Sequence, residues 1–219
     1  LVLDEFDKSL ELGFEKEMTE IVGALPNVQQ RILTSATNEA AIPEFVGLQK
    51  QVAINFLEEG ASQLVIKTIL SPEKDKLNTL KKALILMDGE PGIVFCNFKD
   101  TIDEVSEFLF DNNINHDCFH GGMEQFDRER ALIKFRNGTN QLLLATDLAA
   151  RGLDIPEIKF ILHYQLPQSN KEFTHRNGRT ARMNHDGIAY ILRWQGERIP
   201  DFIQEIDPQE LAFDDKPST

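Results

Sequence analysis

The sequence predicts an α/β protein whose main domain is built on a parallel β-sheet. Between residues 64 and 194, short apolar runs alternate with stretches in which apolar residues recur at helical spacing. Such alternation is typical of βαβ units, which set strands in parallel and cover the sheet with helices. The run 142–145 (Leu-Leu-Leu-Ala) is apolar throughout, as expected for a strand buried on both faces.

Each element of this domain follows from its local pattern. Strands are predicted at 92–96, 116–120, 142–145, 159–164 and 189–194. Helices are predicted at 74–87, 101–110, 125–138, 173–183 and, more briefly, 197–206. The divisions we expect are an incomplete first domain (1–57), a linker (58–63), the main domain (64–205) and a solvated acidic tail (206–219).

The incomplete first domain shows the same kinds of pattern. Its elements are expected as a strand at 1–3, a helix at 15–25, a strand at 31–33, a short helix at 44–48 and a strand near 52–56.

Composition and charge narrow the classes of function. With 41% hydrophobic residues the chain can bury a core, and no apolar run reaches the length of a membrane span. We therefore expect no membrane partner. Cys96 and Cys118 lie in apolar segments without metal-ligand spacing, which indicates buried thiols in a reducing cytoplasm. The net charge is −13, yet residues 128–182 hold 10 basic and 5 acidic side chains. Because salt screens charges over about 8 Å, this local excess predicts a basic patch that binds nucleic acid weakly on its own.

Polar groups stand where three of the predicted strands end. Thr146 and Asp147 follow 142–145, Asn97 follows 92–96, and Gly121-Gly122 follow 116–120. Ligands of open parallel sheets bind at the carboxyl ends of the strands, so we expect these groups along one edge. Paired glycines before a helix let a phosphate approach the backbone, although a plain turn and cap is equally compatible with them.

Charged groups suggest chemistry at two further places. Asp4 and Glu5 end a strand, where two carboxylates can hold hydrated magnesium and polarise water, although acidic residues are common there. Arg176, Arg179 and Arg182 recur every third residue of a predicted helix, so they need an anionic partner or form a solvated or carboxylate-paired face.

Several stretches resemble motifs of the DEAD-box RNA helicases, in the family's order. They are DEFD at 4–7 (motif II, with Phe6 in the place of alanine), SAT at 35–37 (motif III), GIVFCNF at 92–98 (motif IV), the HG…QxxR element at 120–128, ATDLAARGLDIP at 145–156 (motif V) and HRNGRTAR at 175–182 (motif VI). The resemblance extends over nearly the whole chain. It implies a RecA-like (P-loop NTPase-type) helicase domain preceded by a partial first RecA-like domain.

The resemblance also implies roles for individual residues in an enzyme that uses ATP and Mg²⁺ to unwind or remodel RNA duplexes. The catalytic residues would be Asp4 (on magnesium, through water), Glu5, Arg179 and Arg182, with Asp154 and both arginines on ATP. RNA backbone, without sequence readout, would be contacted by Gly122, Arg128 and Thr146. Coupling between the two domains would use Ser35, Thr37 and His175.

One motif of such an enzyme does not occur in these residues. A P-loop reads G-x-x-x-x-G-K-[ST] and binds phosphates through its amides and lysine, and no such string is present. We therefore expect a helicase core that starts within its first domain, inactive alone and active as the full-length protein. The alternatives are a DNA helicase or translocase on the same domains and a non-catalytic adaptor that keeps the fold.

Overall fold

The computed structural model describes residues 1–35, 42–48, 50, 52–54, 64–147, 158–180 and 187–211. The chain folds as two compact units, Leu1–Leu57 and Glu58–Thr219. In the ranges described, no helix is long and apolar enough to cross a lipid bilayer.

The first unit is built around two parallel strands. Its elements are β1 (Val2–Leu3), α1 (Phe6–Glu11), α2 (Glu15–Gly23), β2 (Ile32–Leu33) and the 3-10 turn η1 (Glu44–Val46). β1 pairs with β2 so that Leu3 lies opposite Leu33. The strand expected near 52–56 is absent over 52–54, where Val52 and Ile54 are 84% and 73% exposed, because no strand of the described chain pairs with them.

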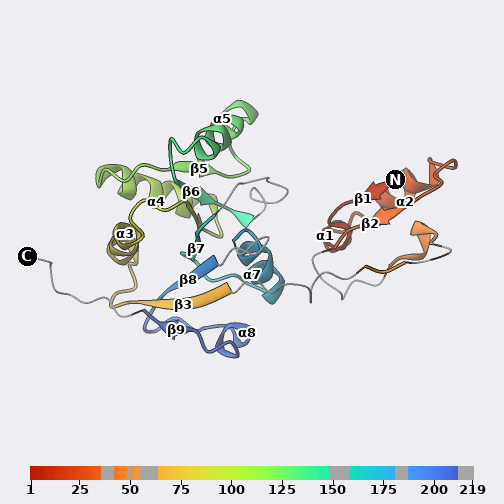
Figure 1. Cartoon of the computed structure of the whole chain (residues 1–219). Helices are drawn as coiled ribbons and strands as arrows, with labels where there is room; N and C mark the ends of the chain where they lie inside the picture. Colours follow the sequence, from red (N-terminus) through yellow and green to blue (C-terminus); the bar gives the residue numbers. More distant parts are fainter. Residues whose placement is uncertain are drawn as a thin grey trace, which may run out of the picture. The chain divides into compact units, whose positions relative to one another are not determined.

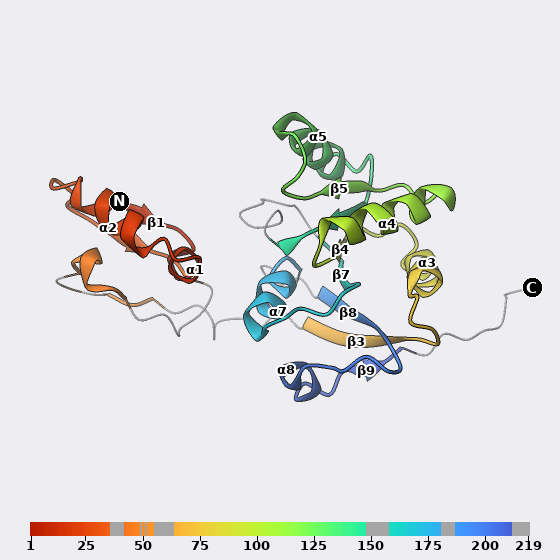
Figure 2. The ribbon, with the colours of Figure 1, turned by 180° about the vertical axis from the view of Figure 1, so that it is seen from behind.

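The second unit contains a seven-stranded sheet in which all neighbouring strands run parallel. Its strands are β3 (Leu64–Ser71), β4 (Gly92–Phe95), β5 (Asp117–Phe119), β6 (Leu142–Ala145), β7 (Phe160–His163), β8 (Gly187–Trp194) and β9 (Gln209–Glu210). Their spatial order is β5-β6-β4-β7-β8-β3-β9. In both Figure 1 and Figure 2, β5 and β9 lie at opposite ends of this series. The predicted parallel-sheet α/β architecture is thus confirmed.

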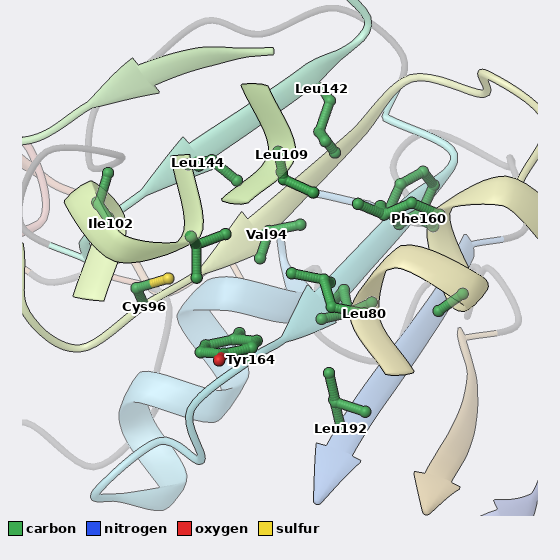
Figure 3. Packing of buried hydrophobic residues seen from close by; sticks show 14 of the residues in the cluster. Leu80, Val94, Cys96, Ile102, Leu109, Leu142, Leu144, Phe160, Tyr164 and Leu192 are labelled. Atoms are coloured by element: carbon green, nitrogen blue, oxygen red, sulfur yellow. The ribbon is translucent and has the colours of Figure 1, made fainter. Parts of the chain in front are cut away.

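Side chains of the central strands alternate between two hydrophobic clusters. The helices of this unit are α3 (Leu77–Leu86), α4 (Lys99–Asp111), α5 (Gln125–Arg136), α7 (Asn170–Asn177) and α8 (Asp201–Gln204). Leu80 of α3 and Ile102 and Leu109 of α4 pack with Val94 and Leu144 in the first cluster (Figure 3). The intervening strand residues, Ile93, Leu143 and Ile161, pack with Ala131 and Phe135 of α5 in the second. Burial on both faces explains why β4 and β6 are apolar throughout and β7 is apolar up to His163.

Three segments of the second unit differ from the prediction. The first is β3, which was not among the predicted strands. The helix expected at 173–183 spans Asn170–Asn177, because the Ser169 hydroxyl caps its start and Gly178 follows its last turn. Gln209–Glu210, expected in the solvated tail, form β9 on the free edge of β3. Backbone pairing of this kind is insensitive to the polarity of the side chains, and Leu211 adds an N–H···O bond of 2.7 Å to Thr68 and packs against the first cluster.

Candidate functional site

The polar groups that follow three strands lie along one edge of the sheet, as predicted. β5, β6 and β4 are adjacent, with Phe119 and Phe95 both opposite Ala145. The N–H of Thr146 donates to the carbonyl of Phe119 (3.3 Å), and that of Cys96 donates to the carbonyl of Ala145 (3.0 Å). The residues after these strands, Asn97, Gly121-Gly122 and Thr146-Asp147, therefore share the carboxyl edge.

Arg176 joins this edge to α7 through its guanidinium. The side chain is 1% exposed and its Cζ lies 5.2 Å from the centroid of the Phe95 ring. Nε and Nη2 donate to the two carboxylate oxygens of Asp147 at 2.7 and 2.5 Å. Nη2 also donates to Asn97 Oδ1 (2.7 Å), and Nη1 donates to the carbonyl of Gln165 (2.9 Å). Arg176 thereby ties together the ends of β4, β6 and β7.

The second N–H of Nη1 of Arg176 determines the tautomer of buried His163. Nη1 lies 3.5 Å from Nδ1 of His163, which must accept because a guanidinium only donates. Nε2 of His163 then carries the proton and donates to Oδ1 of Asn177, on α7, at 3.0 Å. Burial, reinforced by the charge of Arg176, lowers the pKa of His163 to about 3, so the imidazole is neutral at physiological pH.

The expected row of three arginines on one helix face is wrong. Arg176 is buried and paired to Asp147, the carboxylate-paired alternative, whereas α7 ends at Asn177 and Arg179 falls in the following turn. The backbone N–H of Arg179 donates to the carbonyl of Arg176 (3.1 Å). After this turn, the hydroxyl of Thr180 donates a hydrogen bond to the carbonyl of Ile158 (2.7 Å). Helical spacing could not reveal that the helix ends before Arg179, because the chain there pairs with Ile158, which is distant in sequence.

Arg128, on α5, is held against the ring of Phe119 at the end of β5. Its Cζ lies 5.2 Å from the ring centroid, and its buried Nε makes no hydrogen bond within the described part of the chain. A cation–π contact fixes such a side chain without neutralising it. Arg128 therefore keeps its full charge close to the carboxyl edge.

The glycine pair before α5 is arranged differently from a simple phosphate-binding turn. The N–H of Gly122 donates to Nδ1 of His120 (3.2 Å), and the N–H of Met123 donates to the carbonyl of His120 (3.2 Å). His120 is buried and has a structural role, as its place between strand and glycines suggested. A phosphate at Gly122 would depend on close approach to the backbone, since that N–H is already used.

In the first unit, Asp4 and Glu5 sit directly after β1. The hydroxyl of Thr34, which follows β2, donates to a carboxylate oxygen of Asp4 and accepts from the N–H of Glu5 (3.1 Å). Glu5 adopts a left-handed conformation (φ 47°), and Phe6 is buried as the first residue of α1. Asp4 itself stays exposed. The turn after β1 therefore exposes the carboxylate of Asp4 to solvent and buries the ring of Phe6.

The remaining predicted site residues divide by whether the structure describes them. Ser35 is exposed next to Thr34, and His175 is half-buried on α7. Thr37, Asp154 and Arg182 lie outside the described residues. The roles assigned to all of these side chains stay predictions.

Three site residues were missed from the sequence: Thr34, His163 and Asn177. Thr34 follows β2 as Asp4 follows β1, so the parallel register was a signal for it. His163 and Asn177 had none, because one is the last residue of a buried strand and the other lies inside a motif read for its arginines.

The two cysteines carry no reactive signature. Burial raises the pKa of the Cys96 thiol to about 12 and also raises the pKa of Cys118. Both are free thiols, consistent with packing roles.

Comparison with protein families identifies residues 75–184 as a helicase conserved C-terminal domain. The DEAD-box ATP-dependent RNA helicase 35 of Arabidopsis thaliana is 31% identical over 97% of this chain and 39% of its own length. The ATP-dependent RNA helicase abstrakt of Drosophila melanogaster is 29% identical over 95% of this chain and 37% of its own length. The chain therefore spans about two fifths of these curated relatives.

Solved structures share the fold. S. cerevisiae Dbp5 bound to RNA and ADP BeF3 superposes with a TM-score of 0.79 at 22% identity, covering 98% of this chain and 59% of Dbp5. The yeast DEAD-box splicing factor Prp28 gives a TM-score of 0.63 at 26% identity, covering 97% of this chain and 51% of Prp28. The helicase C-terminal domain match and the curated relatives together show that the chain belongs to the DEAD-box RNA helicase family.

Proposed function

We propose that this chain is the part of an ATP-dependent RNA helicase that grips single-stranded RNA and supplies half of the ATP site. The observation that carries the proposal is the shared carboxyl edge, where Gly122, Thr146 and Arg128 lie on or beside adjacent strands. Its support also comes from the curated relatives, which are ATP-dependent RNA helicases by name.

Along this edge the chain would hold the sugar–phosphate backbone. The exposed backbone at Gly122 lets a strand come close, the hydroxyl of Thr146 can donate to a phosphate oxygen, and Arg128 adds a positive charge. Contacts of this kind position RNA but read no sequence. A strand gripped by one face and bent away from its complement cannot remain in a duplex.

The first unit would supply the groups that handle magnesium and water. The exposed carboxylate of Asp4, steadied by Thr34, suits a water ligand of Mg²⁺, and Glu5 would orient the attacking water. When bound, the ion neutralises charge on the ATP phosphates. Arg179 and Arg182 would stabilise charge on the γ-phosphate, and Asp154 would bind the ribose. Because no P-loop sequence occurs in these 219 residues, we propose that hydrolysis belongs to the full-length protein, which we expect to act in the cytoplasm.

Phosphate release in the presence of RNA or DNA tests the proposal. The full-length protein should hydrolyse ATP with strong stimulation by single-stranded RNA and little by single-stranded DNA, and the 219 residues alone should show no turnover. Equal stimulation by DNA would favour a DNA translocase. Absence of turnover in the full-length protein would favour a non-catalytic adaptor.

A matched pair of arginines tests the RNA edge. Arg128→Ala should weaken RNA binding for all sequences and reduce the slope of log affinity against log salt by about 1. Arg130→Ala removes the same charge from an exposed position on the same helix and should change affinity much less. If both variants behaved alike, the effect would be one of overall charge, and the proposed edge would be wrong.

A further inference from the structure

Phe98 occupies an unusual position on the same edge of the sheet. It follows Asn97 at the end of β4 and is the N-cap residue of α4, with extended backbone angles (φ −129°, ψ 150°). The residue is 57% exposed. An N-cap residue in this conformation ordinarily uses a side-chain oxygen to accept a hydrogen bond from the first turn, and Phe98 makes no such bond.

Phenylalanine at this point therefore has two costs for the folded protein. The first turn of α4 lacks a side-chain cap, and a large apolar ring is left in water instead of in the core. Within the described part of the chain, Phe98 is not among the residues of the three hydrophobic clusters. Because Phe98 contributes so little to the stability of the domain, we expect its ring to contact another molecule.

The neighbours of Phe98 place it beside the proposed path of the RNA backbone. A Cβ atom built on Gly122 would lie 3.3 Å from Cδ of Lys99, so the side chain of the residue that follows Phe98 reaches Gly122. Phe119 is the last residue of β5, the strand that precedes the same glycines. Its carbonyl accepts a hydrogen bond from the N–H of Thr146, and its ring packs against the guanidinium of Arg128.

Charged residues of both signs occur at the starts of α4 and α5. Lys99 is followed by Asp100 at the start of α4, and Arg128 is preceded by Asp127 at the start of α5. Stacking of a base on an aromatic ring needs no net charge, and every base has a face that can stack.

We propose that Phe98 is a stacking platform for one base of the single-stranded RNA held along this edge. The inference rests on the proposed function. It adds a contact to a base to the proposed contacts with the sugar–phosphate backbone of the RNA. Such a contact is tolerant of sequence, so it raises affinity for single strands without selecting a particular base.

Three variants of the full-length protein test the platform. Phe98→Thr removes the ring and supplies a capping hydroxyl, Phe98→Ala removes the ring only, and Phe110→Ala removes an exposed ring from the last turn of α4. Phe110 lies about 18 Å from Phe98 along the helix axis. Binding is measured by fluorescence anisotropy, with ADP and beryllium fluoride present, to a labelled oligouridylate and to oligouridylates with an abasic site at each successive position.

We expect both Phe98 variants to bind the intact strand about 5- to 100-fold more weakly, by the same factor at low and at high salt. One abasic site should weaken the wild type similarly and leave the Phe98 variants unchanged. Phe98→Thr should also raise the thermal midpoint by about 2–4 °C, because a capped helix start is more stable. Phe110→Ala should bind as the wild type does.

Other outcomes would overturn the inference in distinguishable ways. If Phe98→Thr kept wild-type affinity, the ring would have no part in RNA binding. If the Phe98 variants lost affinity equally for intact and for every abasic strand, the ring would act through another part of the protein. If the wild type bound neither strand, the proposed function itself would fall, and this inference with it.

Discussion

Arg176→Met keeps most of the aliphatic stem of the side chain and removes its guanidinium. Five N–H donors are lost from a site that is closed to solvent around Arg176. Asp147 loses both of its hydrogen bonds to Nε and Nη2, and Asn97 Oδ1 and the carbonyl of Gln165 each lose one. Methionine supplies no donor to replace them.

The loss in the free energy of unfolding caused by Arg176→Met depends on how exposed Arg176 and Asp147 are. Removing one member of a buried ion pair costs about 3–5 kcal/mol, because the other charge is left unpaired. The side chain of Asp147 is 19% exposed, so water can reach it in part, and we expect the lower end, about 3 kcal/mol. That is roughly a 150-fold shift in the folding equilibrium. For a unit of this size the thermal midpoint should fall by about 6–12 °C.

Urea unfolding of the chain, followed by fluorescence, measures this cost. The single tryptophan, Trp194, lies on β8 and reports on the second unit. Arg130→Met, on the exposed face of α5, is the matched control and should stay within about 0.5 kcal/mol of the wild type. Adding Asp147→Asn to Arg176→Met should cost much less than the sum of the single changes. A loss below about 1 kcal/mol for Arg176→Met, or additivity within about 0.5 kcal/mol, would refute the assignment of Arg176 as the junction of the edge.

Three further predictions concern pH and catalysis. Unfolded histidine takes up a proton below its ordinary pKa of 6.5, whereas buried His163 does so only near 3, so its contribution to stability is complete above pH 6.5 and lost as pH falls. Urea titrations at pH 7 and pH 5 should show that the wild type loses about 2 kcal/mol more than His163→Gln over this interval; equal losses would contradict the buried neutral imidazole. Thr34→Ala should lower RNA-stimulated ATP hydrolysis by the full-length protein about 10- to 100-fold through loss of the Asp4 contact, while Thr34→Ser, which keeps the hydroxyl, should stay within a few-fold. Arg182→Ala should lower the hydrolysis rate by about 10³ with little change in ATP affinity, and a rate within about threefold of wild type, or roughly 0.7 kcal/mol, would make Arg182 structural.

Local pattern was sufficient for strands β4 to β8 of the second unit and for their common edge. β4 and β6 are apolar throughout, and β7 is apolar up to its last residue, His163, because helices cover both faces of the sheet. A polar residue marks the end of each buried run. Parallel connections then require those ends to lie on one side, which is why Asn97, Gly122 and Thr146 could be placed together from sequence alone.

What the tertiary structure alone decided is the use of each polar side chain at that edge. In the sequence Arg176 and Arg179 look equivalent, but the partners of Arg176 come from positions between 11 and 79 residues away. Those partners make Arg176, one member of the predicted arginine row, a buried junction between strand ends. The same applies to β9, whose pairing with β3 depends on a free backbone edge and not on the side chains of Gln209 and Glu210. Hydrogen bonds between distant segments leave no periodic trace in a sequence, because they are set by the geometry of the assembled sheet.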